Sequence, residues 1–160
     1  MKYYDQISDG YDELHREEQL RKLSVIKTNL SIDRSAVLLD VGCGTGFAQE
    51  IFDCEYVGFD PSFELLKKAK KAGGRVFQAI AEQIPLKDNS IDISICVSVL
   101  HHIKDLDKAL NEIKRVTRKI IVFSLFKKSK CFGEIRNKVG SYFKVDKIIN
   151  DDKDLILFAR

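Results

Sequence analysis

The sequence predicts an α/β protein built on one doubly wound sheet of seven strands, mostly parallel, with one antiparallel strand supplied by a C-terminal hairpin. Short apolar runs alternate with segments of helical periodicity, a pattern typical of a parallel sheet covered by helices on both faces. A glycine-rich turn follows the first apolar run, and only the polar stretch Asn150–Asp152 separates the last two. A connection that short favours an antiparallel hairpin.

The seven predicted strands are short runs rich in apolar residues. The first run is almost continuously apolar, as expected for a strand that is buried on both faces of a sheet. In chain order the predicted strands are Ala36–Val41, Tyr56–Asp60, Arg75–Ala79, Ile91–Val99, Lys119–Ser124, Tyr142–Ile149 and Asp154–Ala159.

Helices are predicted between these strands. Pro61 and Ser62 indicate the start of one helix, since proline suits the first turn and serine favours helix N-termini. Gly73 and Gly74 end that helix. An apolar stripe from Leu106 to Val116 predicts another helix before the fifth strand. Two further helices are predicted at Phe47–Phe52 and, ahead of the first strand, at Glu17–Leu30.

The composition is that of an ordinary folded domain, with 160 residues, 44% hydrophobic and 32% charged. No apolar run approaches the ~18 residues needed to cross a bilayer. The N-terminal segment is polar and acidic, unlike a signal peptide. These features predict one domain, no membrane association and a cytoplasmic location. The four cysteines lie far apart without a C-x-x-C pair, which argues against a zinc site and a disulfide framework.

The turn after the first strand carries the main functional signal. It reads Asp40-Val41-Gly42-Cys43-Gly44-Thr45-Gly46, and its glycines would let a ligand approach the backbone at the carboxyl edge of the sheet. Asp60 ends the next strand 20 residues after Asp40, where a carboxylate can accept both hydroxyls of a ribose. Asp40 would repel a pyrophosphate but not a cationic amine or sulfonium. This difference favours S-adenosylmethionine over a dinucleotide.

The sequence around this turn, LLDVGCGTGFAQE, closely resembles the first motif of class I S-adenosylmethionine-dependent methyltransferases, which have a Rossmann-like fold. VGFDPSFELLKKAKK resembles their second motif, and AIAEQIPLKDNSIDISICVSVLHHIKD resembles the third and fourth motifs of the ubiquinone-biosynthesis-type group. RVTRKIIVF is similar to the next strand, and YYDQISDGYDEL to the N-terminal cap of that group. We therefore divide the single domain 1–160 into a cap and helix (1–30), a cofactor-binding core (36–124) and a basic connection with the closing hairpin (125–160).

The resemblance implies which residues bind S-adenosylmethionine. In it Asp60 binds the adenosyl ribose and Tyr11 closes over the methionine end of the cofactor. Ile80 stands where many relatives carry an acid for the adenine amino group, so the adenine would depend on the backbone at Ala81 and on apolar packing. The predicted cofactor-binding residues are Tyr11, Asp40, Gly42, Cys43, Gly44, Gly46, Phe47, Asp60, Pro61, Ala81, Glu82 and Val97.

Three side chains near this site have two interpretations each. Glu82 would bond the ligand or the loop near Asp40, or else cap its own short helix. His101 and His102 follow the fourth strand, and either is a candidate general base because histidine titrates near neutral pH. The alternative is that one imidazole packs against the next helix and the other bonds locally. Two histidines without a third ligand do not make a metal site.

Positive charge gathers after the fifth strand. Leu125–Ile148 holds seven basic and two acidic residues, a net charge of +5, whereas the whole chain carries +3. Aromatic residues interleave with these cations, and the combination suits an RNA acceptor whose affinity a small partner subunit would supplement. A solvated lysine-rich surface over a pocket for a small-molecule acceptor is the alternative. A catalytically silent binding subunit with the same fold is the rival to an enzyme.

Overall fold

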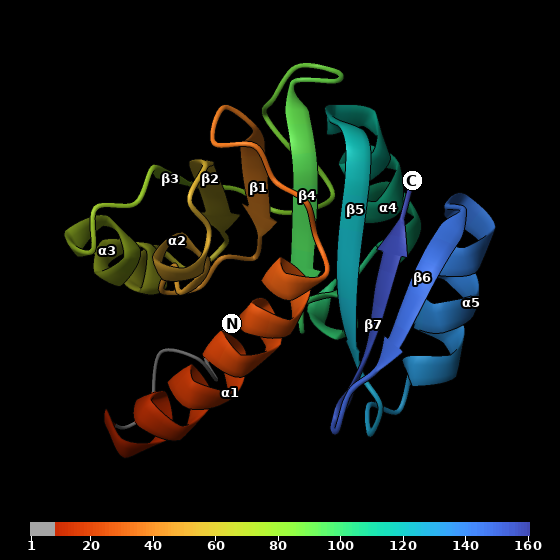
Figure 1. Cartoon of the computed structure of the whole chain (residues 1–160), viewed down its shortest axis with the longest axis horizontal. Helices are drawn as coiled ribbons and strands as arrows, with labels where there is room; N and C mark the ends of the chain where they lie inside the picture. The colour runs from red at the N-terminus through yellow and green to blue at the C-terminus, as the bar shows by residue number, and fades with distance from the viewer. Residues whose placement is uncertain (1–8) are drawn as a thin grey trace.

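A seven-stranded sheet forms the centre of the computed structural model, which describes the backbone of residues 9–160 and the side chains of residues 13–160 (Figure 1). The strands are β1 (Val37–Val41), β2 (Glu55–Asp60), β3 (Val76–Gln78), β4 (Ile91–Val97), β5 (Thr117–Phe126), β6 (Val145–Asn150) and β7 (Asp154–Ala159). Their order in the sheet is β3-β2-β1-β4-β5-β7-β6. Neighbours from β3 to β5 are parallel, whereas β7 is antiparallel to both β5 and β6. The predicted doubly wound sheet with one antiparallel strand is confirmed.

Helices cover both faces of this sheet. On one face pack α1 (Asp9–Thr28), α2 (Ala48–Ile51) and α3 (Phe63–Lys71). On the other pack α4 (Leu106–Val116) and α5 (Phe132–Tyr142) (Figure 1). A single 3-10 turn, η2 (Leu100–His102), follows β4 at the carboxyl edge. The two helical layers enclose one apolar core on each face of the sheet.

Local signals in the sequence explain where two of these helices begin. The Ser62 hydroxyl accepts a hydrogen bond from the Leu65 backbone N–H at 3.4 Å and caps α3. The Asp105 carboxylate accepts one from the Lys108 N–H at 3.1 Å and caps α4. Each cap satisfies a backbone donor that the first turn of a helix leaves without a partner.

The sequence does not predict helix α5. The sequence predicts a basic connection over residues 125–141 and a strand that begins at Tyr142, but Tyr142 ends α5 and β6 begins at Val145. Gly133 and Gly140 weaken the helical pattern, since glycine is a poor helix former. Ile135 and Val139 nevertheless bury one face of the segment against the core, and this packing stabilises the helix.

Smaller differences concern where elements begin and end. The first helix begins at Asp9 rather than Glu17. β5 is longer than predicted at both ends, and β4 ends at Val97 rather than Val99. The reason for the earlier end of β4 is Ser98, whose φ of +56° takes the chain out of the extended conformation. No helix of the described residues is long and apolar enough to cross a membrane.

Candidate active site

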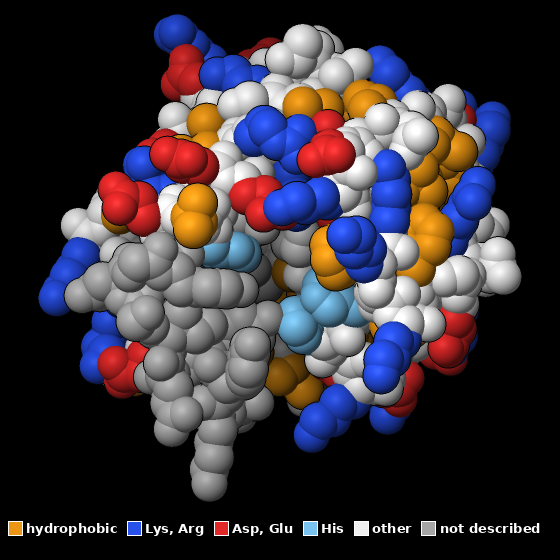
Figure 2. All heavy atoms as spheres, turned by 90° about the horizontal axis from the view of Figure 1, so that it is seen from below, with side chains coloured by type: hydrophobic (Ala, Val, Ile, Leu, Met, Phe, Trp, Pro, Cys, Tyr) orange, Lys and Arg blue, Asp and Glu red, His pale blue; other side chains and the backbone are white. Residues whose placement is uncertain are grey.

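The carboxyl ends of β1, β2 and β4 meet where the strand order of the sheet reverses, the usual location of a ligand site in such folds. Figure 2 looks onto this end of the molecule and shows histidine side chains near its middle, with Lys and Arg side chains around them. Three segments meet here: the loop after β1, the turn after β2 and the end of β4. They carry the predicted residues Asp40, Gly42, Cys43, Gly44, Gly46, Phe47, Asp60, Pro61 and Val97. The side chain of Tyr11 lies outside the described residues.

The glycine loop has a conformation that other residues rarely adopt. Gly42, Gly44 and Gly46 have φ angles of +69°, +53° and +82°. A Cβ added to Gly42 would lie 2.7 Å from the side chain of Val99, whereas one added to Gly44 would meet no atom of the described residues within 4 Å. Position 42 must therefore be glycine, because any side chain there would clash with Val99. Gly44 faces open space in which a ligand can approach the backbone.

Asp60 ties this loop to the end of β2. Its carboxylate accepts hydrogen bonds from the backbone N–H of Gly44 at 2.9 Å and of Ser62 at 2.8 Å. Burial raises the pKa of Asp60, although the two backbone bonds oppose that rise. A carboxylate has about four acceptor positions, so two contacts leave it able to accept further hydroxyl donors.

Asp40 lies beneath the loop on β1, 6% exposed. The Tyr56 hydroxyl donates a hydrogen bond to Asp40 Oδ2 at 3.0 Å. Burial raises the pKa of Asp40 to about 7, and the nearby Asp60 carboxylate adds to the rise, while the Tyr56 bond opposes it. Asp40 therefore changes charge near neutral pH. A cationic group bound above it would favour the carboxylate form.

Cys43 within the loop and Phe47 just after it contact neighbouring elements of the protein. The Cys43 side chain is buried so close to β2 that a Cβ on Gly58 would lie 2.8 Å from Cys43 Cβ. The thiol of Cys43 is therefore turned towards β2, and only the backbone of this residue can face a ligand. Phe47 lies under the Arg16 guanidinium, 6.0 Å from the ring centroid, and Arg16 also pairs with Glu50 at 2.7 Å. These contacts hold α1 over the end of the loop.

The segment after β3 carries the remaining predicted cofactor contacts. Ala81 is buried, while the side chains of Ile80 and Phe63 are 48% and 60% exposed and offer apolar surface near the end of β2. Glu82 Oε1 accepts a hydrogen bond from the Asp105 N–H at 3.3 Å. The structure thus gives Glu82 a contact that neither sequence interpretation included, a link to the start of α4.

His101 and His102 lie together in η2, with ring centroids 3.9 Å apart. The pKa of His101 is lowered to about 4, mainly by burial and also by the neighbouring His102 and Lys22, whereas Asp154 opposes this shift. Burial also lowers the pKa of His102. Both imidazoles are therefore neutral at pH 7, the form that accepts a proton.

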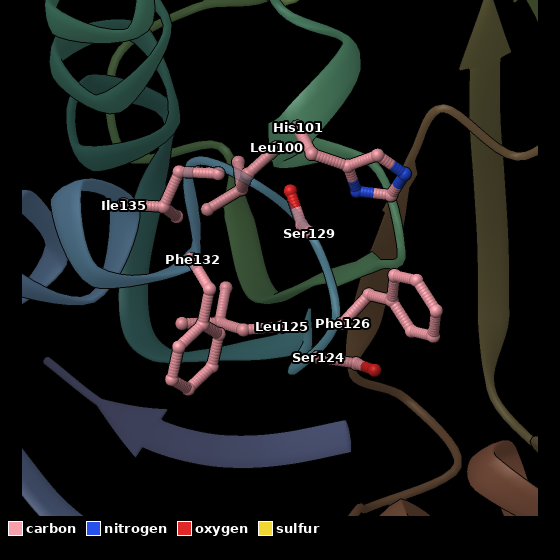
Figure 3. Close-up of a pocket in the computed structure, with 8 residues that line it drawn as sticks. All are labelled: Leu100, His101, Ser124, Leu125, Phe126, Ser129, Phe132 and Ile135. Atoms are coloured by element: carbon pink, nitrogen blue, oxygen red, sulfur yellow. The ribbon is translucent and has the colours of Figure 1, made fainter. Parts of the chain in front are cut away.

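A small hollow opens beside His101 (Figure 3). Its volume of about 10 Å³ is close to the space that holds one water molecule. In Figure 3 the side chains of η2 face those of β5 across it, and α5 closes one side. The lining residues are Leu100, His101, Ser124, Leu125, Phe126, Ser129, Phe132 and Ile135.

Two residues of this region were not predicted from the sequence. Ser98, between β4 and η2, has a positive φ although it is not glycine. Lys22 of α1 is 2% exposed and reaches Ser98 Oγ at 3.0 Å. No signal in the sequence marks either residue, because serine rarely adopts this conformation and a helical lysine is ordinarily exposed.

Comparison with known proteins identifies the family. A sequence profile described as a methyltransferase domain matches residues 39–123, more than half of the chain. The chain belongs to the methyltransferase domain family. The predicted membership of the class I S-adenosylmethionine-dependent methyltransferases is confirmed, and with it S-adenosylmethionine as the cofactor. The site of this methyltransferase domain fits that cofactor, since Gly44 faces open space next to the Asp60 carboxylate.

Relatives of the methyltransferase domain vary in what is known of them. It is 36% identical over 118 residues to an uncharacterized protein of Methanocaldococcus jannaschii, covering 72% of this chain and 46% of that protein. It is 33% identical over 116 residues to malonyl-[acyl-carrier protein] O-methyltransferase of Hamiltonella defensa, covering 68% and 43%. The chain spans about half the length of the curated relatives that it matches.

Solved structures share the fold of the methyltransferase domain. A SAM-dependent methyltransferase from Aquifex aeolicus superposes with a TM-score of 0.71 at 19% identity, over 89% of this chain and 96% of that one. A putative methyltransferase in complex with the Haloferax volcanii Trm112 methyltransferase activator superposes with a TM-score of 0.78 at 14% identity, over 94% and 93%. At these identities the likeness shows the fold alone.

Proposed function

We propose that this chain transfers a methyl group from S-adenosylmethionine to an acceptor that enters beside His101. The observation that carries the proposal is the contact of Val99 with Gly42, which places the turn after β4 between the glycine loop and the hollow. When bound, the cofactor supplies a methyl group on a positively charged sulfur. Asp60 would hold the ribose and Asp40 would face the cationic part.

His101 is the better candidate for a general base of the two histidines. It lines the hollow, and its lowered pKa keeps the imidazole neutral over the physiological range. In that form it can take the proton that an acceptor hydroxyl or amine loses as its lone pair bonds to the methyl carbon. His102 would then pack against His101 and support its orientation.

The acceptor that we propose first is RNA. Several cations of the basic segment are engaged within the protein: Lys127 Nζ bonds the carbonyl oxygens of Asp151 and Asp152, and Lys138 pairs with Asp107 at 2.6 Å. Lys128, Lys130 and Arg136 are exposed and form no salt bridge with the residues that the structure describes. Lys128 and Lys130 flank Ser129, and Arg136 follows Ile135, both lining residues of the hollow. Three such cations around the acceptor entrance would attract a phosphate backbone.

A small-molecule acceptor is the second candidate. It is supported by the aromatic rings that Phe126 and Phe132 contribute to the lining of the hollow. In that case the same cations would be ordinary solvated surface charges.

The two acceptors can be separated by a transfer assay and by charge reversal. Methyl transfer from tritiated S-adenosylmethionine is measured against RNA, protein and metabolite fractions. Lys128→Glu, Lys130→Glu and Arg136→Glu together should weaken RNA binding and reduce the log–log salt slope by about 0.7 for each phosphate that the variant no longer binds. Lys70→Glu, Lys71→Glu and Lys87→Glu, which lie on α3 and before β4, are the matched control. A small-molecule acceptor is favoured if RNA binding is undetectable at low salt. It is also favoured if the two triple variants bind RNA equally well.

A catalytically silent binding subunit is the alternative to an enzyme. It is supported by Ile80, which is exposed and stands where the family resemblance implies that many relatives carry an acid for the adenine. Isothermal titration of the chain with millimolar S-adenosylmethionine decides between them, since absence of binding would exclude the enzyme. We also propose a small partner subunit, a proposal supported by the complex that a structural neighbour forms with an activator protein. Co-purification of the tagged chain from its source cell, followed by mass spectrometry, tests this.

A further inference from the structure

The turn from β4 into η2 connects the two halves of the proposed site. On one side the Val99 side chain packs against Gly42 in the glycine loop. On the other side His101 lines the hollow. Ser98 begins this turn and adopts a φ of +56°, a conformation that costs energy for a residue with a side chain. Contacts with the rest of the protein must therefore stabilise Ser98 in this conformation.

Two contacts hold it. The Ser98 backbone N–H donates to the Ser124 carbonyl oxygen at 3.2 Å, which ties the turn to β5. The Lys22 ammonium donates to Ser98 Oγ at 3.0 Å, which ties the turn to α1. The second contact is a charged donor on a hydroxyl, and it is the only side-chain hydrogen bond that Ser98 makes with the described residues.

Lys22 is itself held by a buried ion pair. Its ammonium lies 2.6 Å from Asp154 Oδ2 at the start of β7 and 3.3 Å from Glu18 Oε1 on α1. Lys22 is 2% exposed and Asp154 is fully buried. Buried ion pairs often stabilise a fold no more than apolar residues of similar size would, because both charges lose their hydration. A role other than stability would therefore explain this pair better.

We propose that Lys22 is a positioning residue, which holds the Ser98–Val99 turn so that the cofactor loop and the acceptor beside His101 keep the separation that methyl transfer needs. The proposal rests on the methyl-transfer function proposed above. Methyl transfer is an in-line displacement, and a displacement of about 1 Å in the alignment of its reactants can cost ~100-fold in rate. Lys22 touches neither reactant and acts through Ser98.

Ser98→Ala tests the contact while leaving the ion pair in place. We expect turnover to fall by roughly 10- to 100-fold, while the cofactor dissociation constant and the unfolding midpoint stay nearly unchanged. Ser98→Asn keeps a polar side chain and tolerates a positive φ, so it should restore most of the turnover. Ser24→Ala removes a hydroxyl from α1, the helix that carries Lys22. Among the described residues this hydroxyl bonds only the Leu20 carbonyl, so the variant should behave like the unaltered chain. Normal turnover in Ser98→Ala would overturn the proposal.

Lys22 is tested in a pair of variants, because Lys22→Met alone leaves Asp154 buried without a counter-charge. That single variant should unfold at a midpoint roughly 10 °C lower. The double variant Lys22→Met/Asp154→Leu should recover most of the midpoint but not the turnover. Recovery of both would show that Lys22 serves stability alone and would contradict the proposal.

A measurement without cofactor separates this proposal from the methyl-transfer function. The amides of Ser98 and His102, which donate to the carbonyl oxygens of Ser124 and Val99, report on the turn by hydrogen exchange. Ser98→Ala should accelerate their exchange by ~10-fold or more, whereas Ser24→Ala should not. Unchanged exchange rates refute the positioning role even if the unaltered chain transfers methyl groups. If the unaltered chain transfers none, the proposed function fails and the exchange rates still decide whether Lys22 holds the turn.

Discussion

The side chain of Val99 packs so closely against Gly42 that a Cβ built on Gly42 would lie 2.7 Å from Val99 Cγ2. Gly42 belongs to the glycine loop, which we propose faces the cofactor, and Val99 to the turn that leads to His101. A side chain at position 42 would therefore separate the two segments, in addition to resisting the φ of +69°. In the function that we propose, this contact links the cofactor half of the site to the acceptor half.

Gly44→Val should abolish binding of S-adenosylmethionine, raising its dissociation constant by ~100-fold or more, about 2.7 kcal/mol. The added side chain would enter the open space next to the loop. Gly73→Val is the matched control, because Gly73 also has a positive φ and open space around it but lies at the end of α3. Titration calorimetry on both variants measures the effect. Equal binding by the two would show that the ligand does not approach Gly44.

Asp60→Ala should weaken cofactor binding by about 1.5–3 kcal/mol, the range for hydrogen bonds to a charged group. The variant loses the predicted ribose contacts and also releases the Gly44 and Ser62 N–H groups. Asp53→Ala is the control, since Asp53 forms an exposed pair with Arg34. Calorimetric titration gives the affinities. An unchanged dissociation constant in Asp60→Ala would mean that Asp60 only orders the loop.

His101→Ala should lower turnover by ~10²–10⁴-fold and leave cofactor affinity intact, if His101 is the base. His102→Ala should have a smaller effect, because His101 rather than His102 lines the hollow. The pH profile gives a second check. The base must be neutral, so turnover should fall as the pH drops through about 4, the lowered pKa of His101, and not near 6.5. A normal rate in both variants would make the histidines structural.

Asp40→Asn should stabilise the cofactor-free protein at pH 8 but not at pH 4. The pKa of Asp40 is raised to about 7 in the folded state, so ionising this buried carboxylate opposes folding. Its penalty is absent below the ordinary pKa of about 4 and grows as the pH rises to about 7, reaching at most ~4 kcal/mol. Urea unfolding of both proteins at the two pH values measures the difference. The same variant should bind S-adenosylmethionine more weakly, because the amide carries no charge. If the variant and the unaltered protein were equally stable at pH 8, the ionised Asp40 would have to lie in a polar environment, and the prediction would be wrong.

Much of the fold could be predicted because its signals are local. The apolar run of β1, the proline and serine before α3 and the apolar stripe of α4 each lie within one segment, and each segment formed the expected element. The glycine loop and Asp60 could be recognised in the same way, since strand ends carry them to one edge of a parallel sheet. Helix α5 was missed because its two glycines conceal a helix that packing against the core stabilises.

The sequence by itself thus determined the sheet, the glycine loop after β1 and the family, whereas the tertiary structure decided which polar side chains contact one another. The sequence predicts Asp154 only as the first residue of a strand after a polar turn, and nothing in it joins Asp154 to Lys22 or Ser98. In the structure these three residues form one cluster: Lys22 comes from α1, Asp154 from β7 and Ser98 from the turn after β4, and the ion pair of Lys22 with Asp154 is buried. Likewise, Lys127 holds the β6–β7 turn rather than lying free on the surface. Burial and ion pairing depend on which segments are in contact, and only the packing of the whole chain determines those contacts.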